Sequence, residues 1–382
     1  MIKTRPLDLR GATRDIEGFI LILFSLLIAS CAQATPTPAP AVIATQTPLP
    51  TATLTPRPSL TPTRVPSPTA TPTPEPRQLT TGGCCVQPAW SPDSRQVLFI
   101  DKPSANEQAG VYAVDIASGA QKPPQRSGPV GAYSQDRSLI TYLDQGRTIV
   151  EKLSSGERWV MPNNYQVAFA PDNQHLAWEE SEDNSTIPYD QRRSDLYIAR
   201  MDGSEAVRVA RVYGGGFVGW LPSGTKILLS ARPSLAVRER TLSVLDLNAK
   251  SSVNLVTAER ISGVSISRDG TWIAYYITFD ADQSRNGIWV QRTDGTPARK
   301  IELWGAYQWR DDGRLLIIPA RVSADRAFKI LEVDAATGKI RKLTDAAVTP
   351  LQILNGDWRV SPDGRYIVYV NSVDRNLWLL TL

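Results

Sequence analysis

The chain has 382 residues, a formal net charge of +4, three cysteines and one histidine. Hydrophobic residues make up 42% of it and charged residues 21%, so most of the chain can bury a core. The near balance of charge argues against nucleic-acid binding, which needs a basic surface. The few histidines and cysteines exclude a metal site built from them, and no cofactor is expected.

Residues 1–31 have the pattern of an export signal. Charged residues precede an uncharged run from Phe19 to Ser30, which as a helix rises about 18 Å, less than the ~30 Å membrane core. The run ends in Ile28-Ala29-Ser30-Cys31, which resembles the bacterial lipobox. The resemblance implies a lipid on Cys31 and an extracytoplasmic protein anchored to a bacterial membrane, at the cell surface or on the periplasmic side. An ordinary signal peptide or a signal anchor is the alternative.

Residues 32–76 have the composition of a linker. They hold 13 of the 29 prolines and 12 threonines, with few large apolar side chains. Proline lacks the amide hydrogen and fixes φ, so neither a helix nor a sheet extends through such a segment. We expect a disordered Pro/Thr-rich stalk between the anchor and a folded domain, with a composition that also suits O-glycosylation.

Residues 77–382 repeat a short pattern seven times. Each copy has an aromatic or aliphatic residue, two variable residues, a turn residue and then an apolar strand. The fourth positions are on average 45 residues apart, the length of a four-stranded propeller blade. The copies begin at Trp90, Tyr133, Phe169, Trp220, Ile266, Trp309 and Val360.

The two ends of this region complete each other. The seventh copy stops after its third strand, at Leu377–Leu382, while Arg77-Gln78-Leu79-Thr80 resembles the fourth-strand sequence Arg341-Lys342-Leu343-Thr344. We therefore predict an all-β fold, a seven-bladed propeller in which an N-terminal strand completes the last blade. Such closure leaves only short, protected strand edges.

Two of the copies resemble the WD40-like repeat of TolB-like β-propellers. They are Trp90-Ser91-Pro92-Asp93 and Val360-Ser361-Pro362-Asp363-Gly364-Arg365. The resemblance covers residues 77–382 and implies the propeller fold; an adaptor role in an envelope complex follows only by analogy. The repeat also occurs in propeller-gated peptidases, but the nearest string to their nucleophile elbow, Gly263-Val264-Ser265-Ile266-Ser267, lacks the second glycine.

The varied loops of such a propeller, after its second and fourth strands, form the expected binding face. The longest, Glu179–Ser194, is rich in charged residues, and six aromatic residues in these loops are candidates for stacking on a sugar or clasping a peptide. The alternative is that these aromatic side chains pack between blades. The candidates are Tyr165, Tyr213, Phe217, Trp304, Tyr307 and Trp358.

Cys84 and Cys85 lie in another of these loops. An exported domain is in an oxidising compartment, but a disulfide between neighbouring residues strains the peptide between them. The sequence leaves a vicinal disulfide and two unpaired thiols open.

The functional prediction is a membrane-anchored binding module without catalysis. No nucleophile, base and oxyanion donors can be assembled from the sequence, so we expect a monomeric TolB-like scaffold whose partner is an envelope or secreted protein, peptide or glycan. The alternative is a carbohydrate-active or lactonase-type propeller enzyme with its site in the central channel. That alternative predicts a carboxylate with a raised pKa at the channel mouth.

Overall fold

The computed structural model describes residues 75–83, 86–102, 104, 106, 109–126, 131–161, 164–182, 186–320 and 327–382. Thr69–Leu382 forms one compact unit. The expected export signal, Cys31, the linker up to residue 74 and the pair Cys84-Cys85 lie outside the described residues, and what the sequence predicts for them remains a prediction. Within the described ranges, no helix has the length and apolarity needed to cross a membrane.

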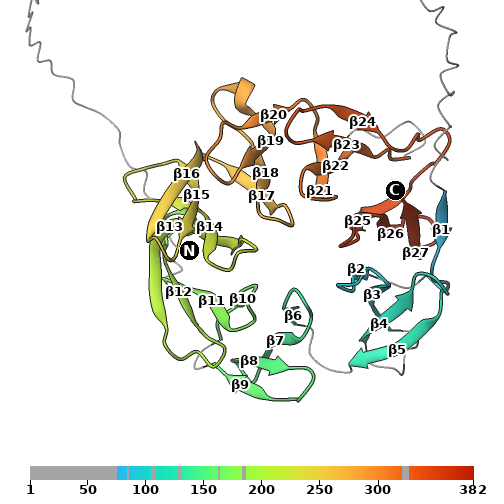
Figure 1. Ribbon diagram of the computed structural model, residues 1–382, viewed down its shortest axis with the longest axis horizontal. Helices are drawn as coiled ribbons and strands as arrows, with labels where there is room; N and C mark the ends of the chain where they lie inside the picture. The colour runs from blue at the N-terminus through green and yellow to red at the C-terminus, as the bar shows by residue number, and fades with distance from the viewer. Residues whose placement is uncertain are drawn as a thin grey trace, which may run out of the picture. The chain divides into compact units, whose positions relative to one another are not determined.

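The folded unit is all-β, and its antiparallel sheets are arranged around a central axis (Figure 1). The two helices among its described residues, η1 (Tyr189–Gln191) and η2 (Gln283–Arg285), are single 3-10 turns. One four-stranded sheet consists of β2 (Val86–Trp90), β3 (Gln96–Asp101), β4 (Gly110–Asp115) and β5 (Gln121–Arg126). A second consists of β6 (Ala132–Tyr133), β7 (Leu139–Asp144), β8 (Arg147–Lys152) and β9 (Arg158–Val160). A third consists of β17 (Ile261–Ile266), β18 (Trp272–Ile277), β19 (Gly287–Arg292) and β20 (Arg299–Ile301). Two more are β21 (Gly305–Trp309), β22 (Arg314–Pro319), β23 (Leu331–Asp334) and β24 (Ile340–Lys342); and β25 (Ile353–Val360), β26 (Tyr366–Asn371), β27 (Leu377–Thr381) and β1 (Pro76–Gln78).

A sixth sheet has seven strands. They are β10 (Val167–Phe169), β11 (His175–Ser181), β12 (Arg193–Arg200), β13 (Val207–Trp220), β14 (Lys226–Arg232), β15 (Arg240–Asp246) and β16 (Ser251–Ala258). The 14-residue β13 pairs with β12 through its first half and with β14 through its second half. It therefore serves as the last strand of the third repeat and the first strand of the fourth.

The prediction of seven separate four-stranded blades is wrong in its number. Five of the repeats form separate four-stranded sheets, whereas the third and fourth repeats are continuous through β13. The physical reason is that β13 continues through a bulge at Gly214-Gly215-Gly216, where Gly214 has φ +58°, whereas the other repeats have a connection between two strands. The prediction of an all-β propeller with four-stranded sheets around an axis is confirmed.

The predicted closure by an N-terminal strand is also confirmed. β1 pairs with β27, with Pro76 opposite Leu380 and Gln78 opposite Trp378. The amide of Leu79 continues the ladder by donating to the carbonyl of Leu377 at 2.8 Å. First and last segments of the described chain thus share one sheet.

The core lies between neighbouring sheets rather than in one central cluster. Leu79, Trp90 and Val97 pack against Val368 and Leu377 between the first and last repeats. Comparable clusters fill the junctions from the second repeat to the last. Strands covered on both faces in this way read as continuous apolar runs, which explains the sequence pattern.

The repeat tryptophans join the innermost strands of neighbouring sheets. The indole N–H of Trp90 donates to the carbonyl of Arg359 at 3.1 Å, and that of Trp309 donates to Ser265 at 3.2 Å. Trp220 makes the same contact with the carbonyl of Ala168 at 3.4 Å, within the seven-stranded sheet. The aromatic position of the repeat therefore has a structural role in these three copies.

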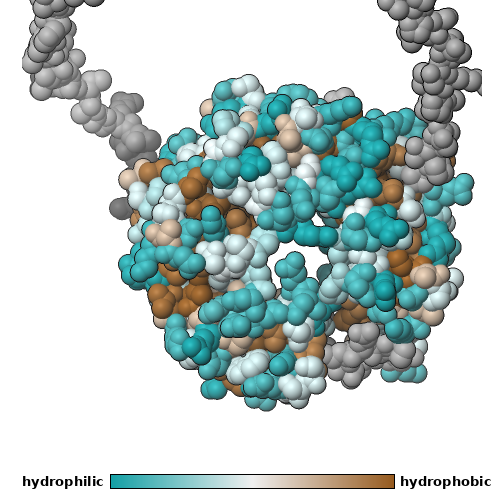
Figure 2. Space-filling view, viewed as in Figure 1, coloured by the Kyte–Doolittle hydropathy of each residue, from teal (hydrophilic) through white to brown (hydrophobic). Residues whose placement is uncertain are grey.

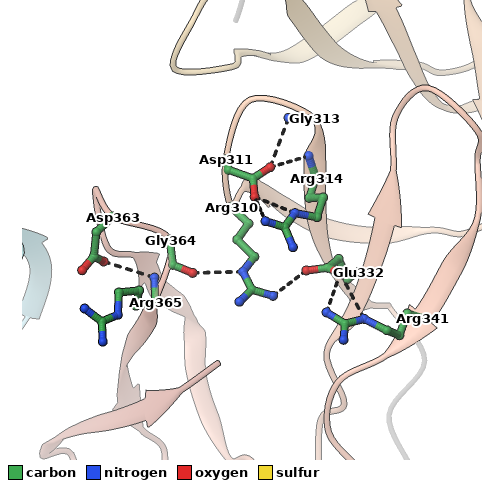
Figure 3. A network of polar contacts seen from close by, with 9 residues as sticks. All are labelled: Arg310, Asp311, Gly313, Arg314, Glu332, Arg341, Asp363, Gly364 and Arg365. Carbon is green, nitrogen blue, oxygen red and sulfur yellow. Dashed lines mark hydrogen bonds and ion pairs between the residues drawn. The ribbon is translucent and has the colours of Figure 1, made fainter.

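Arg310 joins the last two sheets (Figure 3). Arg310 donates through Nε to the carbonyl of Gly364 at 3.0 Å and binds the buried carboxylate of Glu332. Arg341 binds the other oxygen of Glu332 at 2.7 Å. Gly364 has φ +70°, and a Cβ there would lie 2.4 Å from the carbonyl oxygen of Arg310, so the turn needs glycine.

Candidate functional site

The two ends of the propeller differ in their connections. The repeat turns after first and third strands form a turn face, where Asp93 accepts from the Ser91 hydroxyl at 2.6 Å and from the Arg95 amide at 3.1 Å. These hydrogen bonds lower the pKa of Asp93. The opposite end, here called the loop face, carries the longer connections 182–192, 233–239 and 278–286. Figure 2 shows hydrophilic residues around an opening at the centre of the molecule.

A cavity of about 600 Å³ opens on the loop face where β14 and β15 meet β17 and β18. Arginines in and beside two connections, β14–β15 and β16–β17, line it, and we call it the arginine cavity. Its lining residues are Asp190, Arg232, Arg238, Arg240, Glu259, Arg260, Ile261, Ser262 and Thr278. Four guanidinium groups against two carboxylates give the cavity an excess of positive charge.

Only half of these arginines are paired. Arg232 Nη2 lies 3.1 Å from Asp190 Oδ2, and Arg238 Nη2 lies 3.9 Å from Glu259 Oε1. Arg240 and Arg260 have no carboxylate within ion-pair distance among the described residues. Arg260 instead lies over the ring of Phe279, 5.0 Å from its centroid.

Two buried polar side-chain atoms of β14 lack a hydrogen-bond partner among the residues that the structure describes. They are Nε of Arg232, whose side chain is 15% exposed, and Oγ of Ser230 on the same strand. Buried polar atoms are rarely left without a partner in folded proteins, because each loses its hydrogen bonds to water. Arg232 lines the cavity, so its unpartnered Nε–H is suited to an anionic ligand that enters it.

The glycines of β13 bring this site together. A Cβ at Gly214 would lie 2.2 Å from the carbonyl oxygen of Asp190, and one at Gly215 would lie 2.2 Å from that of Ser230. Only glycine allows the connection 182–192 and β14 to approach β13 this closely. This packing places Asp190 within reach of Arg232, across the strand from Tyr213.

The third glycine of this run makes room for a carboxylate. Glu179 occupies the space that a Cβ of Gly216 would need, and its Oε1 accepts from the amide of Phe217. Burial raises the pKa of Glu179 above its ordinary value, and the bond from Phe217 only partly opposes this. A carboxylate with a raised pKa is what the enzyme alternative predicts, and here it lies at the junction of the third and fourth repeats.

The structure brings together two of the six predicted aromatic residues. Trp304, 48% exposed, stacks on Tyr276 with ring centroids 6.0 Å apart, and Tyr307 lies on the same ring at 4.8 Å. The hydroxyl of Tyr307 donates to the carbonyl of Gly263 at 2.6 Å, next to Ser262 of the arginine cavity. Burial raises the pKa of Tyr307, so its hydroxyl stays protonated.

The other four lie apart. Trp358 is 2% exposed and belongs to a core cluster, so the expectation that it lines a binding face is corrected. Phe217 packs edge-on against Trp220 at 6.2 Å, Tyr213 pairs with Arg232 in the ladder, and Tyr165 stacks on Trp178 at 5.7 Å. These residues do not form one aromatic ring around the channel.

The sequence interpretation missed the arginines and Phe279. Phe279 is 76% exposed, has φ +56° and lies beside the cavity, next to Thr278. The only signal in the sequence was the density of arginine in two connections, Arg232–Arg240 and Glu259-Arg260. Nothing in the sequence showed that these connections meet.

A metal site is not evident in the described part of the chain. No group of three or more His, Cys, Asp or Glu side chains there is placed to hold a metal ion. The residues described therefore do not fit a metal centre of this kind.

Comparison with known proteins places the fold. No family model and no curated protein matches the chain. Among solved structures, an oligogalacturonate lyase in complex with manganese has a TM-score of 0.56 at 15% identity, over 80% of this chain and 93% of its own. An oligogalacturonate lyase from Vibrio parahaemolyticus has a TM-score of 0.55 at 11% identity, over 81% of this chain and 97% of its own. A TolB protein from Agrobacterium tumefaciens has a TM-score of 0.40 at 16% identity, over 77% of this chain and 96% of its own.

These findings correct the functional prediction. The interpretation as a TolB-like binding module without catalysis is wrong, because the solved structures above with a TM-score over 0.5 are propeller enzymes. TolB is among the similar structures, as the repeat resemblance implies, but at a lower TM-score. At these identities the likeness itself shows the β-propeller fold alone.

Proposed function

We propose that this chain is a carbohydrate-active enzyme that cleaves a carboxylate-bearing oligosaccharide held in the arginine cavity. One observation carries the proposal: Arg240 and Arg260 have no carboxylate partner among the described residues, and the buried Nε of Arg232 has no acceptor. A guanidinium group binds a carboxylate through two parallel hydrogen bonds, which suits this excess of donors.

The comparisons support the class of substrate. By their names, the lyases of similar fold act on oligogalacturonate, an oligosaccharide with one carboxylate on each sugar. The exposed rings of Phe279, beside Arg260, and of Trp304, which stacks on Tyr276, offer surfaces on which sugar rings stack. The manganese named with one of these lyases has no matching ligand group among the described residues, and no step below involves a metal.

The cavity has the groups that an elimination requires. Arg240 and Arg260 neutralise the sugar carboxylate, which makes the hydrogen on the adjacent carbon more acidic. Glu259 is the general base: its side chain is 52% exposed and its ion pair with Arg238 is long, at 3.9 Å. Glu259 takes this proton, a double bond forms to the next ring carbon, and the bond from that carbon to the glycosidic oxygen breaks. The departing oxygen takes a proton from water, and the hydroxide left behind takes the proton back from Glu259.

The test is an assay of the full chain with oligogalacturonate. We expect new reducing ends together with the ultraviolet absorbance of the new double bond conjugated to the carboxylate. The methyl-esterified oligosaccharide, which has the same sugars without the charge, should not react. Reducing ends without the absorbance would show that the bond is cleaved by hydrolysis and not by elimination. If no carboxylated oligosaccharide gives either product, the proposal is contradicted.

Variants connect the activity to the cavity. Glu259→Gln should lower kcat by about 10²–10⁴-fold, the usual contribution of a general base. Arg260→Gln should raise KM for the charged substrate as well, since it removes one unpaired guanidinium group. Arg95→Gln removes the same charge on the turn face and should leave both constants unchanged.

A further inference from the structure

A second cavity opens on the loop face, on the other side of the seven-stranded sheet. It measures about 270 Å³ and lies where β6 and β7 meet the start of β10. We call it the Tyr165 pocket. Its lining residues include Thr141, Leu143, Asn164, Tyr165 and Gln166.

The ring of Tyr165 forms a rigid wall of this pocket. It stacks on Trp178 with centroids 5.7 Å apart and planes 11° apart, and Trp178 stacks on Tyr197 at 5.7 Å and 13°. The carbonyl of Tyr165 accepts from the hydroxyl of Thr148, a residue of β8 that also lines the pocket. Three stacked rings fix the orientation of Tyr165 before any ligand binds, which lowers the entropic cost of binding.

The polar groups of the pocket are neutral. Asn164 and Gln166 flank Tyr165, both are exposed, and neither side-chain amide has a hydrogen-bond partner among the described residues. No charged side chain is among the described residues that line the pocket. In contrast to the arginine cavity, this site offers amide donors and acceptors beside an aromatic ring, with no charge to attract an anion.

A short connection leaves the pocket open. Only Gln145 and Gly146 join β7 to β8, whereas residues 182–192 join the equivalent strands of the next repeat. Leu143, at the end of β7, is 61% exposed at the rim. Gly131 brings β6 close to β7, because a Cβ there would lie 2.1 Å from the carbonyl oxygen of Thr141.

We propose that the Tyr165 pocket is a binding site for a neutral pyranose ring. The C–H face of the sugar packs on the ring of Tyr165, whose π face is the negative side of its quadrupole. Sugar hydroxyls exchange hydrogen bonds with the amides of Asn164 and Gln166. The site does not depend on catalysis at the arginine cavity; a glycan with both neutral and acidic sugars has a place for each on the loop face.

The proposal is tested by saturation-transfer NMR on the full chain, with methyl galactopyranoside and methyl glucopyranoside as probes. We expect transfer to the C–H protons of one face of at least one probe. Tyr165→Ala should abolish it and Tyr165→Phe should keep it. Because Tyr165→Ala also removes a stacked ring, Asn164→Ala and Gln166→Ala serve as variants that leave the stack intact. Each should weaken binding about fivefold, as expected for one lost hydrogen bond.

Two controls separate this site from the proposed enzyme activity. Gln174→Ala removes an exposed amide on the turn face and should leave the transfer unchanged. Arg260→Gln should also leave the transfer unchanged. If neutral sugars bind but oligogalacturonate is not cleaved, the proposed sugar site is supported and the proposed enzyme activity is contradicted. Absence of transfer from both probes would overturn the proposal, as would binding that neither Asn164→Ala, Gln166→Ala nor Tyr165→Ala weakens.

Discussion

At the scale of single residues, the same side chain type has different roles at different places in the repeat. Trp309 holds two sheets together through its indole N–H, while Trp304, five residues earlier, is half exposed on the loop face. The difference comes from the neighbouring sheet, which presents the carbonyl of Ser265 to one indole and none to the other among the described residues. Burial of an aromatic ring is thus decided by tertiary packing and not by local sequence.

This difference predicts unequal effects of the same substitution. Trp309→Phe leaves the carbonyl of Ser265 without its donor in a half-buried position. The free energy of unfolding should fall by about 1–3 kcal/mol. Trp304→Phe loses no hydrogen bond within the described residues and should change it by less than about 0.5 kcal/mol. Urea unfolding of both variants measures the difference, and equal effects would contradict the role of the indole.

Glu179 predicts a pH dependence of stability. Its pKa is raised in the folded state by burial, so the folded protein binds this proton more tightly than the unfolded chain does. Stability from this group is present below the ordinary value of 4.5 and is lost as pH rises from there through the folded pKa.

The measurement compares the wild type with Glu179→Gln. As the pH rises through this window, the free energy of unfolding of the wild type should fall relative to that of Glu179→Gln. Aspartates with lowered pKa values, such as Asp294 at about 2, act at lower pH and are common to both proteins. A difference that does not vary with pH would show that Glu179 titrates as it does in the unfolded chain.

At the scale of elements, β13 shows how glycine determines the sheet. Three consecutive glycines accept close contacts from Asp190, Ser230 and Glu179, and the ladder shifts register between Tyr213 and Gly216. The strand therefore continues through a bulge where other repeats leave the sheet. Without the glycines, three segments would have to move apart, and the connection that carries Asp190 would move with them.

Gly215→Ala tests this packing. The new Cβ would lie 2.2 Å from the carbonyl oxygen of Ser230, a backbone atom that cannot move away alone. Overpacking of this kind lowers the free energy of unfolding by about 1–3 kcal/mol. Gly313→Ala is the matched control, since no heavy atom lies within 4 Å of its Cβ position. Similar urea midpoints for the two variants would refute the close approach.

The strands and turns were largely predictable from the sequence, and the site was not. Turn residues such as Asp93 and apolar runs such as Leu315–Ile318 act through local chemistry, so the pattern identifies them. The sequence reading did not anticipate the continuity of β13, because a glycine run is typical of a loop as well as of a bulge. The arginine cavity depends on which connections meet in space, and the spacing of Arg232 and Arg260 along the chain contains no such information.

At the scale of the whole molecule, the strand β1 determines whether the propeller is closed. It adds three residues to the last sheet, and Leu79 then enters the core between the first and last repeats with 6% exposure. A ring whose junctions are all packed has no exposed sheet face, while an opened one exposes two. The stability gained by closure therefore belongs to the whole ring and not to the last sheet alone.

Leu79→Ala should weaken this closure. Removal of a buried leucine side chain lowers the free energy of unfolding by about 2–5 kcal/mol. Leu235→Ala changes a leucine that is 57% exposed and should have little effect. Thermal unfolding of both variants is the measurement; if Leu79→Ala unfolds like the wild type, the closing strand does not stabilise the ring.

The continuity of β13 also limits how this propeller can change in evolution. At the other junctions a repeat can be duplicated or deleted by cutting the gene within a connection, and every strand stays whole. A cut between the third and fourth repeats falls inside one strand, whose first half pairs with β12 and whose second half pairs with β14. We therefore expect an insertion or deletion at this junction to interrupt β13, whereas at the other junctions it would change only a connection.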